Sequence, residues 1–134
     1  RYEVNLEAYN KTINVEAQLM VLMANRYIAP AALDYQRAVA ASVTAVRQAG
    51  GTSREGKKLL AKLVKLVDQF RAQTDALAAA LDHVAPSSEK HAKCMRDKVV
   101  PAMVRLREVG DQLEVMAPHA TWPLPTYREM LFIK

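Results

Sequence analysis

Two candidate metal ligands, His91 and Cys94, lie one helical turn apart in the sequence. An imidazole and a thiolate at this spacing could share a zinc ion, and His83 lies a little upstream. A zinc site needs four protein ligands, or three and a water, and the sequence has no second pair at a suitable spacing. We therefore favour a histidine near a helix start and an ordinary buried thiol, and expect no metal site.

Basic side chains recur along one face of a predicted helix: Arg54, Lys58, Lys62 and Lys65, with Lys57 beside them. Such a face could meet nucleic acid phosphates or an acidic partner. No aromatic residue lies between these cations, and no helix-turn-helix or other reading motif occurs. The net charge of +5 includes 14 acidic residues spread among 19 basic ones. We favour a solvated helix face and expect no nucleic acid partner.

Three tyrosines, Tyr9, Tyr27 and Tyr35, fall on one predicted helix stripe. They could line a ligand pocket, but at helical spacing we favour core residues with hydroxyls at the boundary. The sequence contains no phosphate-binding loop, no nucleophile beside a base and no convergent pair of carboxylates. It therefore predicts no catalytic residue.

These residues lie on a helical pattern, since no alternation typical of strands persists. The first helix is predicted over about 2–49, with a kink or short break at Pro30 and a stop at Gly50-Gly51. Its predicted apolar stripe consists of Leu6, Tyr9, Ile13, Ala17, Met20, Ala24, Tyr27, Ala31, Tyr35, Ala38, Ser42, Ala45 and Ala49.

Two further helices follow, over about 53–84 and 88–117. Thr52 and Glu55 are spaced as a capping box for the first of them, and Pro118 ends the second. The stripe of the middle helix is Leu59, Leu63, Leu66, Phe70, Thr74, Leu77, Leu81 and Val84. That of the last helix is Met95, Val99, Met103, Leu106, Gly110, Leu113 and Met116 or Ala117, with a bend expected at Pro101.

The predicted fold is one all-α domain over residues 1–134: an antiparallel bundle of three long helices with a tail at 118–134. The first helix is predicted to be longer than the other two, so roughly its first fifteen to twenty residues should project beyond them. Leu6, Tyr9 and Ile13 would then be uncovered and available for docking.

The tail ends "TWPLPTYREMLFIK", an unusually apolar ending. The prolines predict an extended "WPLP", and Thr126 and Glu129 predict a second capping box that opens a short helix. "WPLP" could be a polyproline ligand for another protein, but docking within the protein is favoured. The candidate docking residues of the tail are Trp122, Leu124, Tyr127, Leu131, Phe132 and Ile133.

Hydrophobic residues make up 51% of the chain, which is typical of a folded domain. No apolar run approaches the roughly 20 residues that span a bilayer, so no membrane partner is expected. No secretory signal is visible, and the lone Cys94 fits a reducing compartment. The first residue is Arg1 rather than Met, so we expect the chain to be a piece of a longer protein.

Three segments resemble a known family: "RYEVNLEAYNKTINVEAQLMVLMANRYIAPAALDYQ" (1–36), "KCMRDKVVPAMVRLREVGDQLE" (93–114) and "WPLPTYREMLFIK" (122–134). They are similar to the C-terminal helical region of type III glutamine synthetases. The resemblance covers nearly the whole chain and is most specific at its end. The stretch 45–90 contributes least, because many alanine- and leucine-rich helices would fit there.

The resemblance implies a cytoplasmic parent enzyme that joins ammonia to glutamate with ATP and Mg²⁺ or Mn²⁺, through a γ-glutamyl phosphate. It implies a dodecamer of two stacked hexameric rings. The partners of this domain would be the upstream catalytic domain and neighbouring subunits. The family's ATP, metal and glutamate motifs are absent here, so the chain alone should hold no cofactor and be inactive. The alternative is a free-standing helical interaction module without ligase activity.

Overall fold

The computed structural model describes residues 2–82 and 92–123, with side chains from residue 8 onward except at position 119. A long first helix consists of α1 (Tyr2–Met23), the π-helical turn η1 (Ala24–Ile28) and α2 (Ala29–Gln48). The other elements are α3 (Arg54–Asp82), the π-helical turn η2 (Met95–Val99), α5 (Val100–Met116) and the 3₁₀ turn η3 (His119–Thr121).

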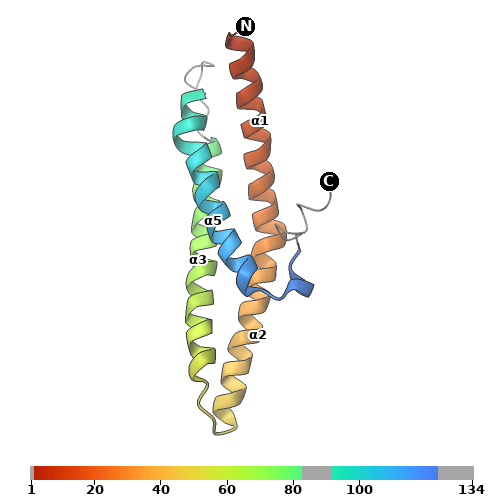
Figure 1. Ribbon diagram of the computed structural model, residues 1–134, viewed down its shortest axis with the longest axis vertical. Helices are drawn as coiled ribbons and strands as arrows, with labels where there is room; N and C mark the ends of the chain where they lie inside the picture. Colours follow the sequence, from red (N-terminus) through yellow and green to blue (C-terminus); the bar gives the residue numbers. More distant parts are fainter. Residues whose placement is uncertain (1, 83–91, 124–134) are drawn as a thin grey trace.

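The three long helical rods pack side by side (Figure 1). α3 runs back along α2 and then along α1, and α5 lies against α3 with η2 touching α1. The described ranges contain helices and turns and no strand. The prediction of an all-α, three-helix bundle with the first helix longest is confirmed.

The turn between α2 and α3 is set by a glycine in the left-handed region. Gly50 has φ +93°, and its N–H donates to Arg47 O at 3.0 Å while Gly51 N–H donates to Val46 O at 2.9 Å. This pair of bonds is a Schellman motif, which needs a residue without Cβ at the left-handed position. The predicted stop at Gly50-Gly51 is confirmed.

The cap of α3 lies one residue later than predicted. Lys57 N–H donates to Ser53 O at 2.8 Å, so Ser53 rather than Thr52 holds the N-cap position. A Cβ added at Gly56 would collide with Ser53 Oγ, which lies over the first turn. Thr52 is the exposed residue between Gly51, where the Schellman turn ends, and the cap at Ser53.

Pro30 and Pro101 are each accommodated by a π-helical turn rather than a break. Ala29 N–H donates to Ala24 O, and Val100 N–H donates to Met95 O, both i→i−5 bonds made by the residue just before a proline. A proline lacks the N–H that an α-helix would use and its ring crowds the carbonyl one turn back. The wider turn before each proline relieves that crowding, so both helices continue through it.

The π-turn η1 shifts the buried face of the first helix by one residue. The prediction that the stripe continues through Tyr27, Ala31, Ala38, Ser42 and Ala45 is wrong, since all but the half-buried Ala31 are exposed. The residues that pack toward the core are instead Ile28, Ala32, Val39 and Val43. A π-helical turn holds one residue more than an α-helical turn, so every later side chain moves one position along the sequence.

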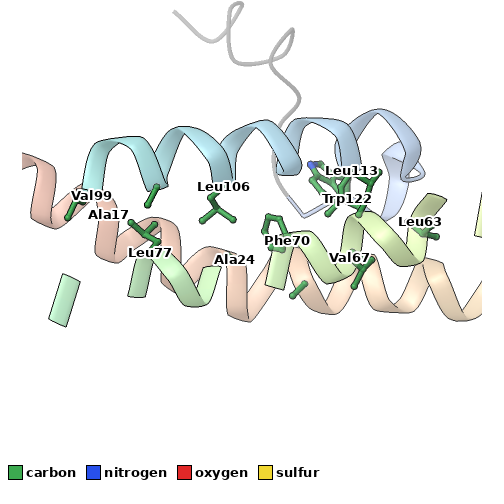
Figure 2. Close-up of a cluster of buried hydrophobic side chains, with 14 of the residues drawn as sticks. Ala17, Ala24, Leu63, Val67, Phe70, Leu77, Val99, Leu106, Leu113 and Trp122 are labelled. Atoms are coloured by element: carbon green, nitrogen blue, oxygen red, sulfur yellow. The ribbon is translucent and has the colours of Figure 1, made fainter. Parts of the chain in front are cut away.

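The other two stripes lie as predicted wherever they are described. The buried members on α3 are Leu63, Leu66, Phe70, Thr74 and Leu77, and Val84 lies outside the described residues. The third helical rod consists of η2 and α5, and its buried residues are Met95, Val99, Ala102, Leu106 and Leu113. Figure 2 shows Ala17, Leu77 and Val99 together on one side of the view, and Val67, Leu113 and Trp122 together further along, before Leu63.

The expected projection of the first helix beyond the bundle is wrong from Asn10 onward. Asn10 is 4% exposed and Ala17 is fully buried, while Ile13 packs against the core. The cover comes from η2, which contacts α1, and from the far end of α3. α3 and the third helical rod therefore reach further along α1 than their lengths alone suggested (Figure 1).

Candidate functional site

The candidate docking residues of the first helix divide between solvent and core. Tyr9 is 44% exposed, whereas Ile13 is half-buried against the core cluster. Leu6 lies in α1, but its side chain is outside the described set. Tyr9 is thus the member of this group that the structure leaves available, and docking there stays a prediction.

Trp122 is the one candidate docking residue of the tail that the structure describes. It is 9% exposed, and its indole Nε1 donates a hydrogen bond to Glu114 Oε2 at 3.1 Å. Leu124, Tyr127, Leu131, Phe132 and Ile133, with the second capping box, lie outside the described residues. Trp122 therefore packs on this chain itself, and docking by the other tail residues stays a prediction.

Local backbone geometry returns Trp122 to the bundle. Ala117 N–H still donates to Leu113 O at 2.9 Å, but Ala117 is extended with ψ 149°, as expected before Pro118. The η3 turn follows, in which Thr121 N–H donates to Pro118 O at 3.2 Å. Its reversal sets Trp122 against α5. The sequence indicated that this tryptophan docks, but nothing in it indicated that Glu114 would accept the hydrogen bond of the indole.

The three tyrosines do not form a pocket. Tyr9 and Tyr27 are 44% and 50% exposed, and Tyr35 packs half-buried against the core. Placing Tyr27 in the core was wrong because η1 turns its side chain outward. The three tyrosine side chains therefore do not line a common ligand site.

The basic face of α3 is solvated throughout. Its five cations are all exposed, and Lys58 Nζ lies 3.4 Å from Glu55 Oε2 in an open i,i+3 pair. Exposed pairs of this kind contribute little to stability. A solvated face and a binding face would both leave these cations exposed, so the absence of a nucleic acid partner stays a prediction.

No metal-binding cluster forms among the residues that the structure describes. These residues include no group of three or more His, Cys, Asp or Glu side chains able to hold an ion. Cys94 is half-buried, while His83 and His91 lie outside the described ranges. Within those same ranges, no helix is both long and apolar enough to cross a bilayer.

Polar contacts between helices occur at the edges of the core. Arg71 Nη1 on α3 donates to Asn25 Oδ1 in η1 at 2.6 Å, and Arg105 Nε on α5 donates to Gln73 Oε1 at 3.4 Å. The first bond holds the π-turn against α3. Both bonds are exposed, and each links two neighbouring helical segments.

A second apolar line runs along α1 and η1 on the side away from the core. We call it the outer stripe: Val15, Leu19, Leu22 and Tyr27, exposed by 60%, 51%, 46% and 50%. The apolar pattern of the first helix was already explained by the stronger inner stripe, so this second line was not predicted. In the sequence, the members of the outer stripe are separated by four, three and five residues. The last interval is longer because it includes the extra residue of the π-turn η1.

Comparison with known proteins points to one family. The model of the glutamine synthetase C-terminal domain matches residues 1–47, and residues 2–47 of this match lie in the first helix. The type-3 glutamine synthetase of Dictyostelium discoideum is 25% identical over 142 residues, with 100% of this chain and 19% of that protein covered.

Two bacterial relatives agree with this match. A glutamine synthetase of Bacteroides fragilis (strain YCH46) is 28% identical over 144 residues, covering 100% of this chain and 20% of its own length. A glutamine synthetase of Butyrivibrio fibrisolvens is 24% identical over 148 residues, and the match covers 98% of this chain and 19% of that protein. The chain spans about a fifth of the length of these relatives. It corresponds to the C-terminal domain of glutamine synthetase.

Proposed function

We propose that this chain is the non-catalytic C-terminal domain of a longer type III glutamine synthetase, in which it buttresses the subunit and shapes contacts between subunits. The observation that supports this most is the alignment of the whole chain with 19–20% of the length of proteins named glutamine synthetase. A segment shared end to end with an enzyme, yet only a fifth of it, is best understood as one of its domains.

The packing supports a structural role. The large buried side chains form a continuous core through the bundle, and the described polar contacts between helices lie at its edges. A bundle of this kind is a stiff body that can brace a neighbouring domain. Among the described residues, no group of three or more His, Cys, Asp or Glu side chains is placed to hold a metal ion.

The chemistry belongs to the rest of the proposed parent. That enzyme would form glutamine from glutamate and ammonia with ATP and Mg²⁺ or Mn²⁺, in the cytoplasm, as a dodecamer. The ATP, metal and glutamate sites would lie outside residues 1–134, and this domain would contact the catalytic domain and neighbouring subunits. The isolated chain is then inactive.

A free-standing interaction module is the second candidate. The observation in its favour is the self-contained core, with Leu63, Phe70, Leu77 and Leu113 each no more than 2% exposed. Such a bundle could fold without a parent enzyme. The two candidates differ in the size of the native polypeptide and in the effect of removing this segment from it.

The deciding experiment deletes residues 1–134 from the full-length polypeptide and measures sedimentation and the rate of glutamine formation. We expect a smaller assembly, a slower rate or both. A Val115→Ala variant, changed at an 86% exposed position, serves as the control that leaves both unaltered. Unchanged assembly and rate after deletion would contradict the structural role. Calorimetric binding of ATP by the isolated chain would contradict its non-catalytic character.

A further inference from the structure

The outer stripe lies almost opposite the core face of α1. Val15 lies two residues before the buried Ala17, and Leu22 lies two residues before the buried Ala24. Two residues correspond to a rotation of about 200° around an α-helix. The first helix is therefore apolar on both sides, and the core of the described residues lies on only one of them.

The described parts of the other helices carry no comparable line. Their exposed large apolar residues are Val64 on α3 and Val104 and Val115 on α5. Val104 and Val115 are eleven residues apart, and exposed charged residues, among them Arg107, Glu108 and Asp111, occupy the turns between them. The double-sided pattern is thus a property of the helix that the family model matches, residues 1–47.

The charges at the ends of the outer stripe disfavour a second copy as the occupant. Lys11 lies one turn before Val15, and Arg26 lies one turn after Leu22, and both are exposed. Antiparallel pairing centred on Leu19 would bring Lys11 of one copy beside Arg26 of the other, and parallel pairing would align each cation with itself. Like charges at this spacing are destabilising in helix pairs.

We propose that the outer stripe docks on the part of the parent polypeptide that lies outside residues 1–134, at an apolar strip bordered by acidic side chains. This rests on the proposed function, because about four fifths of the length of the relatives falls outside the segment that aligns with this chain. Exposed apolar lines of this kind mark protein interfaces. Acidic borders would pair with Lys11 and Arg26.

Photocross-linking in the full-length polypeptide tests the proposal. p-Benzoylphenylalanine replaces Leu19, and a matched control carries it at Val115, which is 86% exposed on α5. Both positions are exposed enough to accept the larger side chain. We expect position 19 to cross-link to peptides outside residues 1–134, and we expect Val15→Glu in the same chain to abolish that product while Val104→Glu preserves it.

Three results would overturn the proposal: cross-links from position 19 to residues 1–134 of another copy, cross-links confined to its own chain within 1–134, or a yield no higher than that from position 115. None of these three results would conflict with a change in assembly or rate in the deletion experiment. A deletion that alters assembly together with a failed cross-link would retain the structural role and reject this surface. A deletion without effect would reject the role itself.

Discussion

The indole of Trp122 donates a hydrogen bond to the carboxylate of Glu114, eight residues earlier, with 3.1 Å between Nε1 and Oε2. This contact fastens the segment after α5 onto the helix that it has just left. The ring also lies beside Leu113 and Val67, which are 1% and 3% exposed. A residue beyond the last long helix is therefore part of the packed domain (Figure 2).

Removal of this ring should destabilise the chain. We expect Trp122→Ala to lower the free energy of unfolding by about 3 kcal/mol, the usual cost of deleting a large buried aromatic side chain. Glu114→Gln retains an acceptor and should cost about 1 kcal/mol or less. Urea unfolding measures both changes, with Val115→Ala as the control. Equal stability of Trp122→Ala and the unmodified chain would show that the tail does not pack in solution.

The turn at Gly50 should be sensitive to any side chain. Gly50→Ala forces a Cβ into φ +93° and should cost about 1–2 kcal/mol. No atom lies within 4 Å of the added Cβ, so the cost would be conformational rather than steric. Thr52→Ala, at the exposed link, is the control and should stay within about 0.5 kcal/mol. Thermal unfolding of the three chains compares them, and equal midpoints would reject the left-handed turn.

The extra residue in η1 predicts that one deletion is tolerated and another is not. Deleting Tyr27 in a Pro30→Ala background should convert the π-turn into an α-turn and leave both buried faces aligned. Deleting Leu33 in the same background should rotate Val39 and Val43 out of the core by about 100°. Circular dichroism during urea unfolding should show a cooperative transition for the first variant and a strongly weakened one for the second. The reverse order would contradict the register.

The layer formed by Leu77, Val99 and Ala17 should tolerate truncation poorly. All three are 1% exposed or less, and Leu77→Ala should cost about 2–5 kcal/mol. Leu33→Ala, at a position 48% exposed, is the matched control on the first helix and should cost far less. Chemical denaturation gives both values. A small loss at Leu77 would mean that α3 and the third rod do not pack on α1 as described.

Sequence periodicity predicted the number of helices, their order and the buried face of α3. It succeeded there because an uninterrupted helix keeps a constant angle between residues, so the stripe through Leu63, Phe70 and Leu77 can be read directly. It failed in α2 because the predicted stripe kept a constant angle between residues across η1, where the π-turn holds one residue more. Pro30 indicated an irregularity in the helix. In the structure this irregularity is a π-turn, which holds one residue more than an α-turn, and the helix is not broken.

The candidate surfaces were predicted less well. Tyr9 and Trp122 were identified by their apolar character, but whether each is covered depends on how far the neighbouring helices reach. Glu114 was missed because its partner is brought back by η3, a reversal that local propensity does not specify. The outer stripe was missed because one apolar face already explained the helix.

The central claim is that this chain is one domain of a longer glutamine synthetase. The most direct measurement is the size of the native polypeptide in source cells, detected with an antibody against this segment. We predict a band several times larger than the 14.9 kDa of the chain. A native band at 14.9 kDa would contradict the claim and leave a free-standing helical module.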